Sequence, residues 1–137
     1  NGVPDKNLMV KRYIKTSTTH SGSNIDTSLL RTKECLIRTT NHLLKNVLDS
    51  SDLAESYYFM FDRLRGIRQD LVKQNYTSVY IDRDIVDVYE RMARYHIAVD
   101  YLLCEENTRF DPITNEEQLS KIFTSLSDMC MEKLTSR

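Results

Sequence analysis

Residues 53–74 read LAESYYFMFDRLRGIRQDLVKQ, and this stretch decides the fold class. Its apolar side chains recur every three or four positions, which is the spacing of one face of an α-helix. The members of this stripe are Leu53, Tyr57, Met60, Phe61, Leu64, Ile67 and Leu71. Asp49-Ser50-Ser51-Asp52 comes just before it and supplies residue types that cap helices. The stretch is therefore predicted to be an amphipathic helix with one buried face.

Three more stretches show the same helical spacing on either side of the first. One covers about residues 29–48, and another covers about 81–104 after a connector at 75–80. The last starts at a capping box, Thr114-Asn115-Glu116-Glu117. Its apolar positions are Leu119, Ile122, Phe123, Leu126, Met129 and Cys130. With only three Gly and two Pro in 137 residues, tight turns are scarce, and an all-α fold is expected.

The stretch 81–104 carries apolar residues on two faces. Ala93, Ile97 and Tyr101 fall opposite its main stripe, so this helix is expected to be covered on two sides. A stack of helix pairs provides such an inner position. The predicted fold class is therefore all-α, with stacked antiparallel helices in an α-solenoid-like (helical repeat) fragment.

The N-terminal residues differ from the rest of the chain. Residues 1–28 are predicted to be an arm and flexible linker, with a short motif at 8–13 and a polar stretch at 16–28. Residues 29–137 are predicted to be the helical domain. No apolar run in the chain approaches the roughly 20 residues that span a bilayer.

Charge and cysteine usage narrow the range of possible functions without identifying one. The net charge is −1, which gives no overall field for nucleic acid. Residues 1–68 are mildly basic and residues 69–137 are acidic, which indicates polarised surfaces. Cys35, Cys104 and Cys130 each lie in a helical apolar pattern and are expected to be buried, reduced thiols.

The sequence lacks the constellations that catalysis needs. An enzyme needs a nucleophile with its base, a metal set or a phosphate cradle, and no such pattern is present. The histidines His20, His42 and His96 are isolated from one another and from any cysteine pair at metal spacing. His96 is interpreted as a core or boundary histidine. No enzymatic activity, no cofactor and no metal are therefore expected.

The densest polar motif is residues 62–70, DRLRGIRQD, in the middle of the quoted stretch. On a helix, Arg63 and Asp70 share one flank, and Arg68 lies near the edge of the apolar stripe. One interpretation is a structural network of charge-assisted hydrogen bonds that locks this helix to its neighbours.

A second interpretation gives the same motif a binding role. Asp62, Arg65 and Gln69 share the other flank, and the basic side chains could form a face for phosphates or an acidic partner. Arg63, Arg65 and Lys73 are the candidates for such a partner or RNA contact. The aspartates dilute this face and no aromatic ladder accompanies it.

The motif also carries a resemblance to a known family. Residues 61–70 resemble the signature helix of the nuclear mRNA-export scaffolds of the suppressor-of-actin and germinal-centre-associated nuclear protein group. Residues 90–97, ERMARYHI, are similar to that family's second block, and its Arg94 and His96 are assigned to the structural network. Residues 8–13 and 36–44, together with 104–106 and 110–111, lie where family members carry similar stretches.

The resemblance implies a non-catalytic scaffold of the transcription-coupled export complex, located in the nucleus at nuclear pores. This chain resembles the N-terminal helical half of a longer family domain. The implied partners are a protein with a related helical and winged-helix domain and a small acidic protein, with no membrane and no small-molecule substrate. Two alternatives remain open, an RNA-binding helical module and a short family member at centrosomes or spindles.

Overall fold

Helices form nearly all of the computed structural model, which describes residues 9–15, 27–74, 82–105 and 110–135. A short 3-10 helix, η2, covers Thr27–Leu29. The main helices are α1 (Lys33–Asn41), α3 (Leu53–Lys73), α4 (Arg83–Leu103) and α5 (Pro112–Thr135). Between α1 and α3, the helix continues through the π-helix η3 (His42–Val47) into α2 (Leu48–Ser50). The described residues contain no strand, so the all-α prediction is confirmed.

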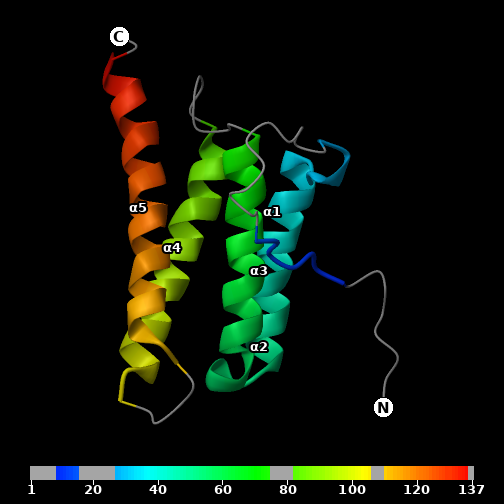
Figure 1. Ribbon diagram of the computed structural model, residues 1–137, viewed down its shortest axis with the longest axis vertical. Helices are drawn as coiled ribbons and strands as arrows, with labels where there is room; N and C mark the ends of the chain where they lie inside the picture. Colours follow the sequence, from blue (N-terminus) through cyan, green and yellow to red (C-terminus); the bar gives the residue numbers. More distant parts are fainter. Residues whose placement is uncertain (1–8, 16–26, 75–81, 106–109, 136–137) are drawn as a thin grey trace.

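Successive long helices run in alternating directions (Figure 1). Helices α1 and α3 pack against each other, and both contact α4. Helix α5 packs along α4 at the edge of the stack (Figure 1). Helix α4 is therefore the inner helix, and the molecule is two antiparallel helix pairs placed side by side.

Helix starts are set by polar side chains that accept hydrogen bonds from the first free backbone N–H groups. Asp52 caps α3 and accepts from the backbone N–H groups of Ala54, at 2.9 Å, and Glu55, at 3.2 Å. Thr32 caps α1, so this helix begins at Lys33 instead of near residue 29. The linker prediction for 16–28 falls mostly outside the described residues.

The predicted capping box at Thr114 is wrong. Helix α5 begins two residues earlier, at Pro112, because the Asp111 carboxylate accepts the N–H of Ile113 and the hydroxyl of Thr114. Proline suits the first helical position, where its missing N–H would have no partner within the helix. The Thr114 hydroxyl therefore donates to the cap and does not act as one.

The predicted apolar stripes form one core shared by all four helical segments. Its fully buried members include Leu36, Leu43, Met60, Leu64, Ile67, Leu71, Ile85, Val88, Tyr89, Met92, Val99 and Ile122. Burial of each large aliphatic side chain contributes about 1.5–3 kcal/mol to folding. This shared core packs α3 against α1 and α4.

Two predictions about burial are wrong. On the second face of α4, Ala93 is buried, but Ile97 is 49% exposed and Tyr101 is 80% exposed. Helix α4 contacts α1, α3 and α5, as expected of an inner helix, but these neighbours bury only Ala93 of its second face.

The three cysteines form the second wrong prediction, because all of them are exposed free thiols. Cys35 and Cys130 lie on the outer faces of α1 and α5, and Cys104 lies at the end of α4. In α5, Phe123 is also half-exposed, which leaves a narrower buried stripe than the sequence indicated.

Candidate interaction site: the arm-binding face of helix α3

Residues 9–15, called the arm from here on, cross helix α3 near the middle of its length (Figure 1). The arm has no regular secondary structure. It lies on a face of α3 formed by Asp62, Arg65, Gly66, Gln69 and Asp70, and we call these five residues the arm-binding face. Their spacing of three, four and seven or eight positions places them on one side of the helix. The opposite side of α3 carries the buried stripe.

Asp70 is the most buried charged group of this face, with 1% of its side chain exposed. Its carboxylate accepts from Lys11 Nζ at 3.2 Å and from Arg31 Nε at 2.8 Å. The backbone N–H of Arg31 also points at Oδ2, at 3.4 Å. One carboxylate therefore joins the arm to the start of the helical domain. Its buried negative charge is compensated by the cations of Lys11 and Arg31.

Asp62 holds the other end of the arm. Its Oδ2 accepts from the backbone N–H of Tyr13 at 3.2 Å and from Arg63 at 2.6 Å. One and two turns further on, Arg65 lies over the Tyr13 ring at 3.9 Å and Gln69 Nε2 donates to the Ile14 carbonyl at 2.8 Å. The predicted flank of Asp62, Arg65 and Gln69 is thus a real surface.

Gly66 lets the arm approach the helix closely. A Cβ atom at this position would lie 3.3 Å from Tyr13 N and 3.4 Å from both Arg12 C and Lys11 O. All three are backbone atoms, which cannot rotate away as a flexible side chain could. The glycine in the middle of α3 is therefore explained by contact with the arm.

The structure does not bring the predicted network of Arg63, Arg68 and Asp70 together. Arg63 pairs with Asp62 and lies 4.4 Å from the Phe59 ring centroid. Arg68 is half-buried, and its Nε has no hydrogen-bond partner among the described residues. Burial lowers the pKa of this guanidinium. Asp70 instead pairs with residues far away in sequence.

The other predicted members lie elsewhere. Arg94 is an exposed residue paired with Glu90 of the same helix at 3.0 Å, and the neighbouring predicted pair of Asp87 and Arg91 is present at 3.8 Å. Lys73 lies half-buried in the last turn of α3.

His96 is buried between α4 and α5, as the sequence predicted. Asn115 Nδ2 donates to the His96 carbonyl at 2.9 Å, which orients the amide so that its Oδ1 faces the ring. Nδ1 of His96 therefore carries the proton and donates to Asn115 Oδ1 at 2.7 Å. Burial holds the pKa of His96 below 6.5, although the hydrogen bond with Asn115 opposes the shift, and Arg68 lowers it further. This pair fastens α5 to α4.

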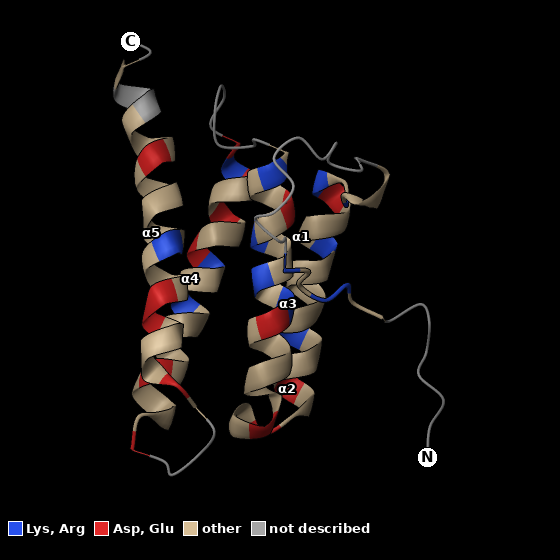
Figure 2. Cartoon of the chain, viewed as in Figure 1, with Lys and Arg blue, Asp and Glu red and all other residues tan. Residues whose placement is uncertain are grey.

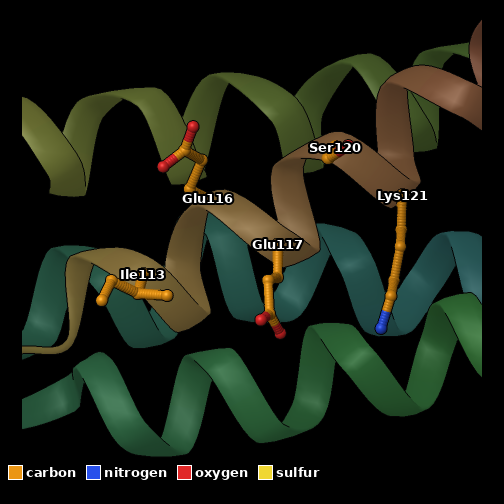
Figure 3. Close-up of a pocket in the computed structure, with 5 residues that line it drawn as sticks. All are labelled: Ile113, Glu116, Glu117, Ser120 and Lys121. Atoms are coloured by element: carbon orange, nitrogen blue, oxygen red, sulfur yellow. The ribbon is translucent and has the colours of Figure 1, made fainter.

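The outer side of α5 is a second exposed feature. An open hollow there is lined by Ile113, Glu116, Glu117, Ser120 and Lys121. Figure 3 shows Glu117 and Lys121 extending from one edge of the helix and Glu116 from the other. Ile113 is 70% exposed and Phe123, beside a neighbouring hollow, is 48% exposed. Apolar side chains framed by charges are typical of a protein-binding surface.

Sequence reasoning missed the partners of this site. Sequence spacing does not point to Lys11, Tyr13 and Arg31, because their contacts with α3 join residues 39 to 59 positions apart in the chain. Asn115 was read as part of a capping box. The one signal that could have found the arm was the glycine inside a long helical stripe, which often marks a close backbone approach.

Two kinds of site are absent from the described residues. No group of three or more His, Cys, Asp or Glu side chains in them is placed to hold a metal ion. None of the helices in this part of the chain is both long and apolar enough to cross a membrane.

Comparison with known proteins gives one matching family model and related proteins whose names agree with it. The model of the SAC3/GANP family matches residues 1–135. SAC3 family protein 1 of Schizosaccharomyces pombe is 34% identical over 121 residues, which are 88% of this chain and 11% of that protein. SAC3 family protein B of Arabidopsis thaliana is 30% identical over 133 residues, 90% of this chain and 7% of that protein.

A third relative is more distant. Protein xmas of Drosophila melanogaster is 28% identical over 108 residues, which are 73% of this chain and 5% of that protein. The chain thus spans between 5% and 11% of the length of these relatives. No solved structure matches.

Proposed function

This chain belongs to the SAC3/GANP family, and from that membership we propose that it is a non-catalytic helical module of a nuclear mRNA-export complex. It acts at the nuclear pore by docking other proteins. The observation that carries the proposal is the family match over residues 1–135, together with the signature helix at 61–70 from which the resemblance was drawn.

The structure supports docking over chemistry. The charged groups of the signature helix are used within the chain, because Asp70 is buried against Lys11 and Arg31 and Asp62 holds the Tyr13 backbone. What α5 offers to solvent is an apolar surface with a charged border. A surface of this composition binds protein by area and shape, with a few apolar anchors that contribute most of the affinity.

The partners follow from the family resemblance. We propose that they are a protein with a related helical and winged-helix domain and a small acidic protein. The arm lies beside α3 (Figure 2), and its Arg12 and Lys15 are exposed to solvent. These two basic residues favour an acidic partner on that side.

The test replaces the matched segment of the Schizosaccharomyces pombe relative with this chain and measures nuclear retention of poly(A) RNA. The chimera should export RNA normally, whereas Ile113→Glu with Phe123→Glu on α5 should cause retention. Val72→Glu, at an exposed apolar position of α3, is the matched control and should leave export normal. Normal export with the α5 double variant would contradict docking through this face.

An RNA-binding module is the runner-up. It would use Arg63, Arg65 and Lys73, but Arg63 is paired with Asp62 and Arg65 is stacked on Tyr13. Pull-down from nuclear extract with and without nuclease separates the two functions. Partners that survive nuclease treatment indicate protein docking, and partners that disappear indicate an RNA bridge.

A further inference from the structure

We propose that the arm-binding face of α3 is a binding site for an extended Lys-Xaa-Tyr segment, which the chain's own arm fills and from which it can be displaced. The same site then takes a segment of the same chemistry from a partner protein. This inference does not rest on the mRNA-export proposal, because it is argued from contacts within the chain.

The arm contacts α3 in the way that a bound peptide does. Each hydrogen bond between the arm and α3 in the described residues uses a side chain of α3, from Asp62, Gln69 or Asp70. The arm contributes backbone groups and the Lys11 ammonium, while Tyr13 is the aromatic anchor under Arg65. Such a pattern recognises a non-helical backbone and two side chains that lie two positions apart.

The site keeps its charge balance when the arm leaves. Asp70 loses Lys11 but keeps Arg31 at 2.8 Å, and Asp62 loses the Tyr13 N–H but keeps Arg63 at 2.6 Å. Removing one member of a buried ion pair is strongly destabilising because it leaves an uncompensated buried charge. Because each carboxylate keeps one cation of the helical domain, departure of the arm leaves a preformed site.

The arm also has little that ties it to the core. Met9 is 68% exposed and Ile14 is 51% exposed, and Arg12 and Lys15 face solvent. Val10 is the one arm residue that packs against the core cluster. The arm is therefore held by a few polar contacts, the Arg65–Tyr13 contact, close backbone packing on Gly66 and the Val10 side chain, which together make a small interface.

The experiment uses the full chain and a synthetic peptide with the sequence of residues 8–16. In the variant Lys11→Ala with Tyr13→Ala, the chain's own arm is weakened and the site becomes available. NMR titration should show saturable shifts of the α3 amides at 62–70, with a dissociation constant of about 0.1–1 mM for so few contacts.

The wild-type chain provides the comparison. A tethered arm competes at an effective concentration of about 1 mM, so the peptide should bind the wild type about two- to tenfold more weakly than the variant. Adding Gly66→Leu to the variant should abolish binding, because the new side chain occupies the space of the arm backbone. A scrambled peptide of the same charge should not bind.

Three results would overturn the proposal. The first is equal binding of the scrambled peptide, which would mean charge attraction alone. The second is an absence of peptide binding to the folded variant. The third is unfolding of the arm variant, detected by circular dichroism, which would make the arm an inseparable part of the core.

Discussion

Single residues at the centre of the buried stripes carry most of the packing energy. Leu64 of α3 and Met92 of α4 are 1% and 0% exposed and contact the shared core from two sides. A cavity in such a position costs both the lost transfer energy and the lost contacts of the surrounding side chains.

Truncation of either residue should therefore be severe. We expect Leu64→Ala or Met92→Ala to lower the free energy of unfolding by about 2–5 kcal/mol, measured by denaturant melts. Val72→Ala, at an exposed position of the same helix, is the control and should change it by about 0.5 kcal/mol or less. Losses below that size for the core variants would mean that the stripes face water.

Asp70 should behave as a structural charge. Asp70→Ala removes the carboxylate that pairs with the largely buried Arg31 and leaves the Lys11 ammonium with the Leu29 carbonyl, so we expect a loss of about 3 kcal/mol in thermal or denaturant unfolding. Asp84→Ala removes an exposed partner of Lys33 and should change stability far less, because solvent screens this pair. Unchanged stability with stronger RNA binding in Asp70→Ala would favour a phosphate-binding role for this face.

His96 should make stability depend on pH. Burial lowers the pKa of His96 in the folded chain. As pH falls through 6.5, the unfolded chain therefore binds a proton at His96 while the folded chain stays unprotonated there. Unfolding free energy should therefore decrease below pH 6.5, down to the folded pKa. His96→Gln should lose this dependence between pH 7 and 5, while the control His42→Gln should keep it. Parallel profiles for wild type and His96→Gln would exclude this group.

At the scale of elements, α3 makes contacts on two opposite faces. Its stripe enters the core, and its charged face holds the arm through Asp62, Gly66 and Gln69. Helices with one buried stripe normally expose the other side to water. Here the second side is partly covered by a segment from the start of the chain, which explains the density of polar and small residues in 62–70.

Gly66 provides a test of this arrangement in which the sign of the effect changes. Within a helix, Gly→Ala normally stabilises by about 0.5–1 kcal/mol. In the full chain Gly66→Ala should instead destabilise, because its Cβ would press on the arm backbone and strain the Tyr13 and Ile14 hydrogen bonds. In the background Lys11→Ala with Tyr13→Ala, the same change should stabilise. Chemical denaturation of the four variants measures the coupling, and additive effects would contradict the contact.

At the scale of the whole molecule, positive and negative charges nearly cancel, but they are unevenly distributed over the surface. The net charge is −1, and the aspartates of the signature helix are neutralised within the chain. Lys and Arg positions of the arm lie next to those of α3 (Figure 2), and the exposed Arg12 and Lys15 give a local positive field only.

Nucleic-acid binding should accordingly be weak. We expect a dissociation constant no tighter than roughly 10⁻⁶ M for RNA or duplex at physiological salt. Fluorescence anisotropy at several salt concentrations measures it, with Arg65→Ala as the variant and Arg94→Ala, on an exposed face of α4, as the matched control. Nanomolar affinity with a steep loss in salt, reduced only by Arg65→Ala, would support the RNA-binding alternative.

The sequence by itself determined the helices and their buried sides. Apolar spacing located α3, α4 and the main stripe of each, and Asp52 was recognisable as a cap, because these features depend on neighbours within one or two turns. It misplaced the start of α5, where Asp111 and Pro112 compete with Thr114 for the same cap.

Only the tertiary structure decided which charges pair and which second faces are covered. Sequence spacing suggested Arg63 and Arg68 as partners of Asp70, but the packed chain gives it Lys11 and Arg31. It also left Tyr101 in solvent and placed the arm on Gly66. Helical periodicity reports how residues lie along one helix, whereas pairing and coverage depend on segments that are distant in sequence and meet only when the core forms.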